Sequence, residues 1–90
     1  MTRRVEIFST ILCPFCYRAK KLFESKGVPF EEIDVMLRPG RRREMIERTG
    51  GRTSVPQIFV DGTHIGNCDE IHDMEAEGRL DALLHKAAAE

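Results

Sequence analysis

A pair of cysteines lies between a short apolar segment and an amphipathic one, and no other feature limits the possible folds of this chain as strongly. The pair is Cys13-Pro14-Phe15-Cys16. Residues 5–9 before it (VEIFS) are apolar and β-prone, which predicts a buried strand. After it, apolar residues recur at helical spacing as far as Phe23, and Gly27 ends the pattern, which predicts a helix. The pair therefore stands at the first turn of a helix that follows a strand.

The chemistry of the pair follows from this placement. Proline lacks only an N–H group that would be unpaired in the first helical turn, so Pro14 suits that turn and fixes Cys13 at the mouth of the helix. Unpaired backbone N–H groups and the positive end of the helix dipole favour a thiolate there. Cys16 follows three residues later, within bonding distance of Cys13. We therefore expect Cys13 to attack disulfides and Cys16 to resolve the resulting mixed disulfide.

The middle of the chain continues to alternate strands and helices. Residues 30–35 predict a second strand, and residues 41–49 predict a second helix. Two further short strands are expected at residues 57–60 and 63–65. The two residues between them, Asp61-Gly62, are typical of a type I′ turn, so this part of the chain predicts an antiparallel hairpin.

Two helices are expected after the hairpin. Asn67 followed by Glu70 matches an N-cap and its capping-box partner, at the start of a helix that continues through Glu77. Beyond Gly78, apolar residues again recur at helical spacing and predict a final amphipathic helix. These residues are Leu80, Leu83, Leu84, Ala87 and Ala88.

The predicted elements follow the order β-α-β-α-β-β-α-α. A length of 90 residues suits one domain, so residues 1–90 are expected to fold as a single unit. A βαβ unit followed by a hairpin and helices predicts an α/β fold with a four-stranded mixed sheet and helices on both faces. This is the smallest arrangement of the thioredoxin fold, which commonly carries a Cys-x-x-Cys pair in cytosolic proteins.

Composition excludes several classes of protein. With 41% hydrophobic and 32% charged residues, the chain has the balance of a soluble globular protein. No apolar run approaches the ~20 residues that span a bilayer. No apolar segment of the kind found in secretory signals follows Arg3 and Arg4. We therefore expect a cytoplasmic protein that does not associate with membranes.

Charge is distributed unevenly along the chain. Residues 1–53 carry 12 Lys/Arg and 7 Asp/Glu, a net charge of +5, whereas residues 54–90 carry 2 and 8, a net charge of −6. A net charge of −1, no Trp and one Tyr do not fit a nucleic-acid binder, but a small anionic ligand suits the basic N-terminal half. We interpret the arginines at 38 and 41–43 as a solvated loop and helix start, with docking of anionic proteins as the alternative.

The number of cysteines bears on the kind of site. Three cysteines is an odd number, which argues against a disulfide-stapled secreted scaffold. On residue types alone, His64 and Cys68 are able to complete a four-ligand zinc site with Cys13 and Cys16. The strand, the proline and the helix around the first pair favour redox chemistry instead.

Four separated stretches, taken together, resemble the glutaredoxin family over essentially the whole chain. They are Cys13-Pro14-Phe15-Cys16, Arg18-Ala19-Lys20, residues 53–59 (TSVPQIF) and residues 64–70 (HIGNCDE). The resemblance implies a thioredoxin fold and a glutathione-dependent thiol-disulfide oxidoreductase. It further implies glutathione as reductant and co-substrate, with disulfide-bonded or glutathionylated proteins as partners. We expect a monomer that needs no metal.

The same resemblance implies which residues hold glutathione. Val55-Pro56 is expected to have a cis peptide bond, and the Val55 backbone to pair with the cysteinyl unit of glutathione. Asp69 and the backbone N–H of Cys68 are expected at the γ-glutamyl end, and Arg52 at the glycyl carboxylate. The full set of expected glutathione-binding residues is Phe15, Arg52, Ser54, Val55, Pro56, Cys68 and Asp69.

Three residues depart from the family pattern. Phe15 stands where many members have Tyr, and Thr10 stands where Lys is common before the first cysteine. Asn67 replaces the second glycine of a usual Gly-Gly pair, and we expect the turn to survive because Asn tolerates a left-handed backbone. These changes bear on glutathione affinity more than on the type of reaction.

Two other functions are compatible with a cysteine pair of this kind. One is an iron–sulfur carrier, in which two chains share a cluster through Cys13 and bound glutathione; Pro14 and the competing Cys16 thiol argue against it. The other is a thioredoxin-like hydrogen donor that a flavin reductase reduces directly. Dependence of turnover on glutathione distinguishes the leading hypothesis from this donor.

Overall fold

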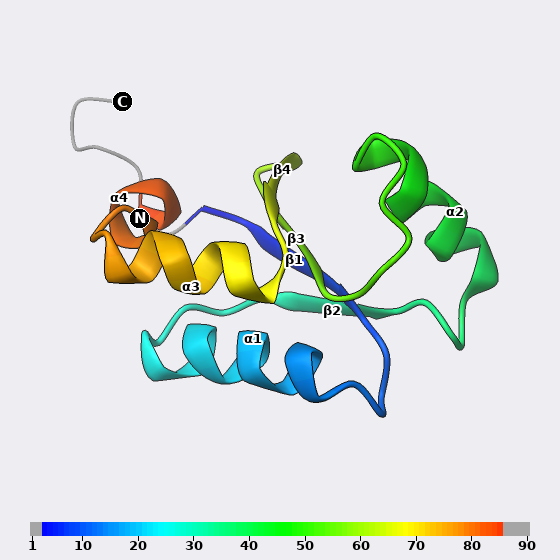
Figure 1. Ribbon diagram of the computed structural model, residues 1–90, viewed down its shortest axis with the longest axis horizontal. Helices are drawn as coiled ribbons and strands as arrows, with labels where there is room; N and C mark the ends of the chain where they lie inside the picture. The colour runs from blue at the N-terminus through cyan, green and yellow to red at the C-terminus, as the bar shows by residue number, and fades with distance from the viewer. Residues whose placement is uncertain (1–2, 86–90) are drawn as a thin grey trace.

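The strands form one mixed sheet. We analysed a computed structural model, which describes residues 3–85. In the sheet the strand order is β2-β1-β3-β4 (Figure 1). β1 (Val5–Ser9) pairs in parallel with β2 (Glu31–Asp34) and antiparallel with β3 (Gln57–Val60), and β3 pairs antiparallel with β4 (Thr63–Gly66). The expected four-stranded mixed sheet and the order β-α-β-α-β-β-α-α are confirmed.

Helices cover both faces of the sheet, as expected. α1 (Pro14–Ser25) and α3 (Cys68–Ala76) lie together on one face, whereas α2 (Pro39–Arg48) lies apart from them (Figure 1). The short helix α4 (Leu80–Leu84) packs beside α3 and contributes to the same core.

The sheet separates two hydrophobic cores. The larger one joins β1 and β3 to α1, α3 and α4, and it contains Val5, Ile7, Ala19, Phe23, Val28, Ile58, Val60, Cys68, Ile71, Leu80 and Leu84. The smaller one lies under α2 and contains Phe8, Ile33, Val35, Met45 and Phe59. β1 is therefore buried on both faces, and all five of its residues are buried, including the polar Glu6 and Ser9.

The β3–β4 hairpin has the expected turn. Asp61 and Gly62 have φ values of 50° and 82°, and positive values at both central residues define a type I′ turn. The turn is also bonded to the residue before β1, because the Arg4 N–H donates to the Asp61 carboxylate at 2.9 Å and the Asp61 N–H donates to the Arg4 carbonyl at 2.8 Å.

Some predicted boundaries were wrong. α2 begins at Pro39 rather than at residue 41, because proline at the first helical position lacks only an N–H that would be unpaired and has a φ already suited to a helix. The second strand is shorter than expected and runs from Glu31 to Asp34. In the final helix, Leu80–Leu84 are confirmed, and Ala87 and Ala88 lie outside the described residues. Within residues 3–85, no helix combines the length and hydrophobicity needed to cross a bilayer.

Candidate active site

The cysteine pair lies at the N-terminus of α1. Cys13 is the N-cap, with φ −102° and ψ 113°, and Pro14 occupies the first helical turn. The Cys16 N–H donates to the Cys13 sulfur at 3.2 Å. The Cys13 sulfur thus accepts a backbone hydrogen bond at the positive end of the α1 dipole. The local geometry therefore matches the one that the sequence predicted for an attacking cysteine.

The second cysteine has a different environment. Cys16 is fully buried, whereas Cys13 is partly exposed. Burial, reinforced by the contact with Cys13, raises the pKa of the Cys16 thiol to about 12. Cys16 therefore keeps its proton at neutral pH, while its sulfur remains one helical turn from Cys13. This asymmetry fits an exposed nucleophile with a buried resolving thiol.

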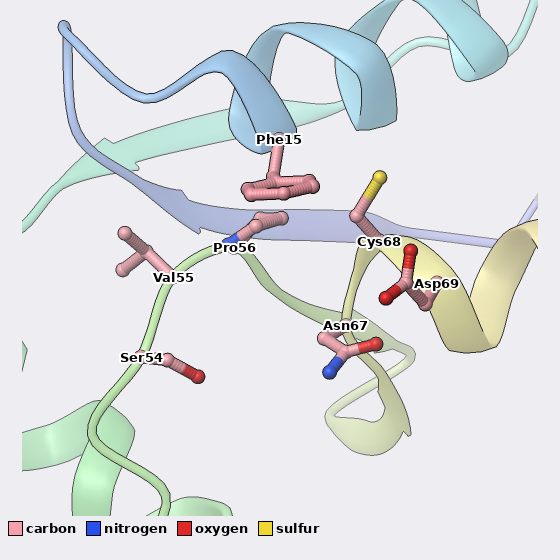
Figure 2. Close-up of a pocket in the computed structure, with 7 residues that line it drawn as sticks. All are labelled: Phe15, Ser54, Val55, Pro56, Asn67, Cys68 and Asp69. Carbon is pink, nitrogen blue, oxygen red and sulfur yellow. The ribbon is translucent and has the colours of Figure 1, made fainter.

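A pocket of about 200 Å³ opens beside the cysteine pair (Figure 2). Its walls come from the start of α1, the loop before β3 and the start of α3. The lining residues are Phe15, Ser54, Val55, Pro56, Asn67, Cys68 and Asp69. Six of the seven expected glutathione-binding residues are thus brought together, and the Val55-Pro56 bond is cis as expected. The Cys13 thiol lies 3.8 Å from the Val55 carbonyl oxygen, so the Cys13 sulfur lies next to a residue that lines the pocket.

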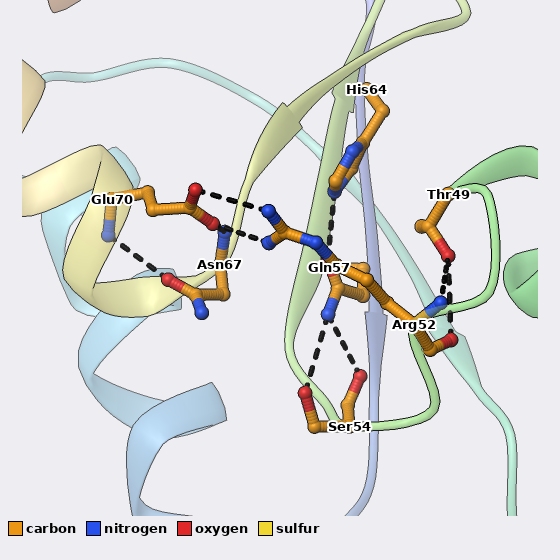
Figure 3. A network of polar contacts seen from close by, with 7 residues as sticks. All are labelled: Thr49, Arg52, Ser54, Gln57, His64, Asn67 and Glu70. Carbon is orange, nitrogen blue, oxygen red and sulfur yellow. Dashed lines mark hydrogen bonds and ion pairs between the residues drawn. The ribbon is translucent and has the colours of Figure 1, made fainter.

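Arg52 lies elsewhere. It does not line the pocket; its guanidinium makes a two-pronged contact with the Glu70 carboxylate, through Nη1 to Oε1 and through Nη2 to Oε2, the latter at 3.1 Å (Figure 3). The contact raises the pKa of Arg52 and lowers the pKa of the Glu70 carboxyl. Arg52 is thus paired with Glu70, for which the sequence predicts only a helix-capping role.

Glu70 performs two tasks at once. Besides the contact with Arg52, its Oε1 accepts the backbone N–H of Asn67 at 2.9 Å, and the Asn67 side chain accepts the Glu70 N–H at 3.0 Å (Figure 3). The expected capping box is therefore confirmed. Glu70 joins the loop before the cis proline to the first turn of α3, and these two segments form opposite walls of the pocket.

The turn at Gly66-Asn67 is present, but it does not require a left-handed backbone at Asn67. Asn67 has φ −104° and ψ −168°, which is extended backbone, because an N-cap residue normally takes this conformation. The unusual conformation belongs to Gly66, at φ 144°. A Cβ atom added to Gly66 would lie 2.7 Å from the Cβ of Glu70, so the α3 start and the β4 end approach too closely for any side chain there.

A buried glutamine supports the pocket wall from behind. Gln57 is fully buried in β3, and its side-chain N–H groups donate to the Ser54 carbonyl at 3.0 Å and to the Ser54 hydroxyl at 3.4 Å (Figure 3). Its Oε1 lies 2.7 Å from Nε2 of His64, and burial lowers the pKa of His64. No structural role is predicted for Gln57 from the sequence, although a polar residue inside an otherwise apolar strand indicates a buried hydrogen bond.

The hypothetical zinc ligands do not converge. His64 contacts Gln57, and Cys68, whose sulfur points toward α1 (Figure 2), lies 3.6 Å from Nδ1 of His72. Burial raises the pKa of the Cys68 thiol, which keeps it protonated. Between residues 3 and 85, no group of three or more His, Cys, Asp or Glu side chains is arranged to hold a metal ion.

Comparison with known proteins agrees with this geometry. The family model described as glutaredoxin matches residues 5–65. Glutaredoxin 3 of Escherichia coli strain K12 is 51% identical over 80 residues, which cover 89% of this chain and 95% of the relative. A glutaredoxin of Pseudomonas aeruginosa is 49% identical over 80 residues, which cover 89% and 94%.

Solved structures show the same similarity. The solution structure of glutaredoxin from Brucella melitensis has a TM-score of 0.80 and 46% identity, and the match covers 92% of this chain and 89% of that one. The buckwheat glutaredoxin–glutathione complex has a TM-score of 0.82 and 30% identity, covering 89% and 74%. With its cysteine pair at the start of α1 and a pocket beside it, the chain belongs to the glutaredoxin family of thiol oxidoreductases.

Proposed function

We propose that this protein uses glutathione to reduce protein disulfides and glutathione mixed disulfides. The observation that carries the proposal is the contact of 3.8 Å between the Cys13 thiol and the carbonyl oxygen of Val55, a residue that lines the pocket. A nucleophilic sulfur next to a pocket of peptide-binding character suits a substrate that carries its disulfide at the end of a short peptide. The buckwheat relative, solved as a glutathione complex, supports glutathione as that peptide.

The proposed fit of glutathione uses charge and backbone hydrogen bonds. The cysteinyl unit pairs with the backbone of Val55, as an added short strand does. At the γ-glutamyl end, the exposed carboxylate of Asp69 attracts the ammonium group, and the Cys68 N–H at the start of α3 binds the carboxylate. Phe15 and Pro56 supply apolar walls beside the sulfur, and Ser54 extends the wall formed by the loop.

Arg52 is proposed to contact the glycyl carboxylate while it remains paired with Glu70. A guanidinium has five N–H donors, and the contact with Glu70 uses only Nη1 and Nη2 on one side. Its remaining N–H donors are left for a second acceptor, so Arg52 can bind the glycyl carboxylate without breaking its pair with Glu70. The Glu70 carboxylate thereby orients Arg52 rather than competing with the ligand for it.

The reaction with a glutathione mixed disulfide proceeds in two displacements. The Cys13 thiolate attacks the glutathionyl sulfur, a Cys13–glutathione disulfide forms, and the protein thiolate leaves and takes up a proton. A second glutathione thiolate then attacks the glutathionyl sulfur on Cys13, which releases oxidised glutathione and restores the Cys13 thiolate. Overall, one glutathione thiol is oxidised and one protein thiol is regenerated, while the glutathionyl sulfur of the substrate stays in a disulfide throughout.

Reduction of a protein disulfide requires both cysteines. Cys13 attacks one sulfur of the substrate disulfide and forms a mixed disulfide; Cys16 loses its proton and attacks the Cys13 sulfur, which frees the reduced substrate. The Cys13–Cys16 disulfide is then reduced by two glutathione molecules. The high pKa of Cys16 is compatible with this role, since the thiol is needed only after Cys13 has been converted to a neutral disulfide.

The test is a glutathione-coupled reduction assay on the wild type, Cys13→Ser and Cys16→Ser. We expect Cys16→Ser to retain deglutathionylation while it loses most reduction of protein disulfides, and Cys13→Ser to lose both. Retention of either activity by Cys13→Ser would contradict the assignment. Turnover that depends on a flavin reductase rather than on glutathione would favour the thioredoxin-like donor instead.

The remaining expectations belong to the same proposal. The proposed partners are disulfide-bonded and glutathionylated proteins, which this protein reduces. We propose that it acts as a monomer and needs no metal. The cytoplasm is the proposed compartment, because an unpaired set of three thiols suits a reducing environment.

A further inference from the structure

Large exposed apolar side chains occur in the two loops that leave one end of the sheet and at the start of α1. Six large hydrophobic residues are exposed in the described part of the chain: Ile11, Leu12, Phe15, Tyr17, Met36 and Leu37. All six belong to the β1–α1 loop, the first turns of α1 or the β2–α2 loop. Exposed large apolar residues that cluster, instead of being scattered singly, mark interaction sites.

The two loops leave the sheet side by side. β1 and β2 run in parallel and end in register, with Ser9 opposite Asp34, and the Val35 N–H donates to the Ser9 carbonyl at 2.9 Å. The next residues of each chain segment therefore emerge at the same end of the sheet. Leu12 and Leu37 are 84% and 78% exposed there, and neither lines the pocket described above.

The β2–α2 loop is ordered by hydrogen bonds from its backbone N–H groups to Asp34, the last residue of β2. The Asp34 carboxylate accepts the N–H groups of Met36 and Leu37 at 2.8 and 3.1 Å, and the Arg38 N–H donates to the Asp34 carbonyl at 3.1 Å. Met36 and Leu37 are thus displayed to solvent by an ordered turn. Such preorganisation reduces the entropy that a binding surface loses when a partner docks.

Uncompensated positive charge lies next to these apolar residues. Arg38 and Arg43 are exposed and have no carboxylate partner between residues 3 and 85, and Arg42 contacts only the Thr53 carbonyl, at 2.8 Å. By contrast, Arg48 at the other end of α2 pairs with Glu44 at 2.8 Å and with Glu6.

The position of these arginines adds to the effect. They stand at the N-terminus of α2, where there is no acidic residue in the first turn and no side-chain cap, so their charge adds to the positive end of the helix dipole. A carboxylate of a partner protein at this position would neutralise the arginine charge and interact favourably with the positive end of the α2 dipole.

We propose that this apolar-basic surface, formed by Ile11, Leu12, Met36 and Leu37 together with Arg38 and Arg43, docks substrate proteins. The partner it fits is a protein segment that carries apolar side chains and carboxylates close to the cysteine to be reduced. The proposal rests on the proposed function, since it names the class of protein on which Cys13 acts. Apolar contact supplies the affinity, and the arginines select the charge of the partner.

The experiment compares two glutathionylated peptides with the same apolar residues around the cysteine, one flanked by aspartates and the other by lysines. We expect the wild type to reduce the acidic peptide with a kcat/KM about fivefold higher, and this preference to shrink as salt is raised toward 1 M. Arg38→Glu/Arg43→Glu is expected to abolish or invert the preference. Met36→Ser/Leu37→Ser is expected to lower kcat/KM for both peptides.

Two controls keep the outcomes separate. Lys21→Glu/Arg79→Glu changes the net charge equally at exposed positions outside the surface, and it is expected to keep the wild-type preference. Reduction of the small glutathione–cysteine mixed disulfide is expected to be the same in every variant. A wild type inactive on this small substrate would overturn the proposed function.

Other results would overturn the docking proposal alone. These are equal rates on both peptides, or an unchanged preference after Arg38→Glu/Arg43→Glu, in a wild type that is active on the small substrate. A dimer in sedimentation experiments that Met36→Ser/Leu37→Ser converts to monomer would assign the surface to a second copy of this chain instead.

Discussion

Cys13, Cys16 and Cys68 have the same side chain but three different environments. Cys13 caps α1 and is partly exposed, Cys16 is enclosed beneath it, and Cys68 is buried at the start of α3 beside His72. Burial raises the pKa of both Cys16 and Cys68, which favours their neutral thiols. Reactivity toward electrophiles, which depends on a thiolate and on access, is therefore concentrated on one of the three sulfurs.

This difference predicts selective alkylation. In the reduced protein, iodoacetamide at any pH from 7 to 9 is expected to add one carbamidomethyl group, at Cys13, because the Cys16 pKa of about 12 leaves that thiol protonated throughout this range. Peptide mass spectrometry identifies the site. Unfolding in urea is expected to expose all three cysteines, and Cys13→Ser to remain unmodified when folded. Labelling of Cys16 as fast as Cys13 would show that burial does not protect it.

Single residues also show where the sequence was informative. The cysteine pair, Pro14 and the capping box at Asn67 act over three or four positions, so local rules predicted them correctly. The partner of Arg52 is Glu70, 18 positions away. Such a pairing depends on how β4 and α3 return to the loop, and no local pattern contains that information.

At the level of elements, α3 and the loop before β3 depend on one carboxylate for their relative position. Glu70 receives hydrogen bonds from the α3 N-cap backbone and from Arg52. These two segments carry most of the pocket lining, including Val55 and Asp69. Removal of Glu70 should therefore disturb ligand binding before it disturbs the chemistry at Cys13.

We expect Glu70→Ala to raise the KM for glutathione several-fold with kcat less affected, and Glu70→Gln to restore part of the loss because its amide oxygen still accepts the Asn67 N–H. Steady-state kinetics with varied glutathione measures this split. A fall in kcat without a change in KM would exclude the positioning role.

The same pair predicts a dependence of stability on pH. Arg52 holds the pKa of the Glu70 carboxyl below its ordinary value of 4.5, so the folded state binds a proton there less readily than the unfolded chain. The stabilisation is present above that value and is lost as the pH falls through the lowered pKa. Because both side chains are about 40% exposed, solvent screening limits it to about 0.5 kcal/mol. In urea unfolding at pH 7, the free energy of unfolding of the wild type is expected to exceed that of Glu70→Gln. This difference is expected to vanish near pH 3.

At the level of the whole molecule, folding brings oppositely charged parts of the chain together. The sequence divides into a basic half and an acidic half, and several ion pairs join the two, including Lys26 with Glu75 and Asp81 at 2.8 and 2.7 Å. Arg52–Glu70 is another such pair. The uneven distribution along the sequence thus becomes a set of contacts between elements. At the start of α2, Arg41 pairs with Glu44 at 2.7 Å, whereas Arg38 and Arg43 have no carboxylate partner between residues 3 and 85.

The sheet makes the two cores interdependent, which predicts cooperative unfolding. Ile71→Ala in the larger core and Met45→Ala in the smaller one are each expected to cost about 3 kcal/mol, a large share of the roughly 10 kcal/mol typical of a domain of this size. Since β1 belongs to both cores, each variant should unfold in one transition, with an unchanged dependence on urea concentration. A second transition in Met45→Ala, followed by circular dichroism, would show that the α2 face melts independently.

The overall architecture was predictable because the period of apolar residues changes at nearly every boundary, and β1 shows the pattern of a strand buried on both faces. The start of α2 was misplaced because Arg38-Pro39-Gly40 matches a turn as well as it matches a proline-initiated helix. Gln57 escaped notice because its partners, Ser54 and His64, become neighbours only when the loop folds back and the hairpin forms.

The contact between Gly66 and Glu70 restricts how this protein can evolve. The atom that excludes a side chain at position 66 is the Cβ of residue 70, and every amino acid except glycine possesses that atom. A second mutation at position 70 therefore cannot rescue Gly66→Ala unless it also introduces glycine, which would forfeit the helix cap and the partner of Arg52. In a suppressor screen, true reversion to glycine should far outnumber any compensating change.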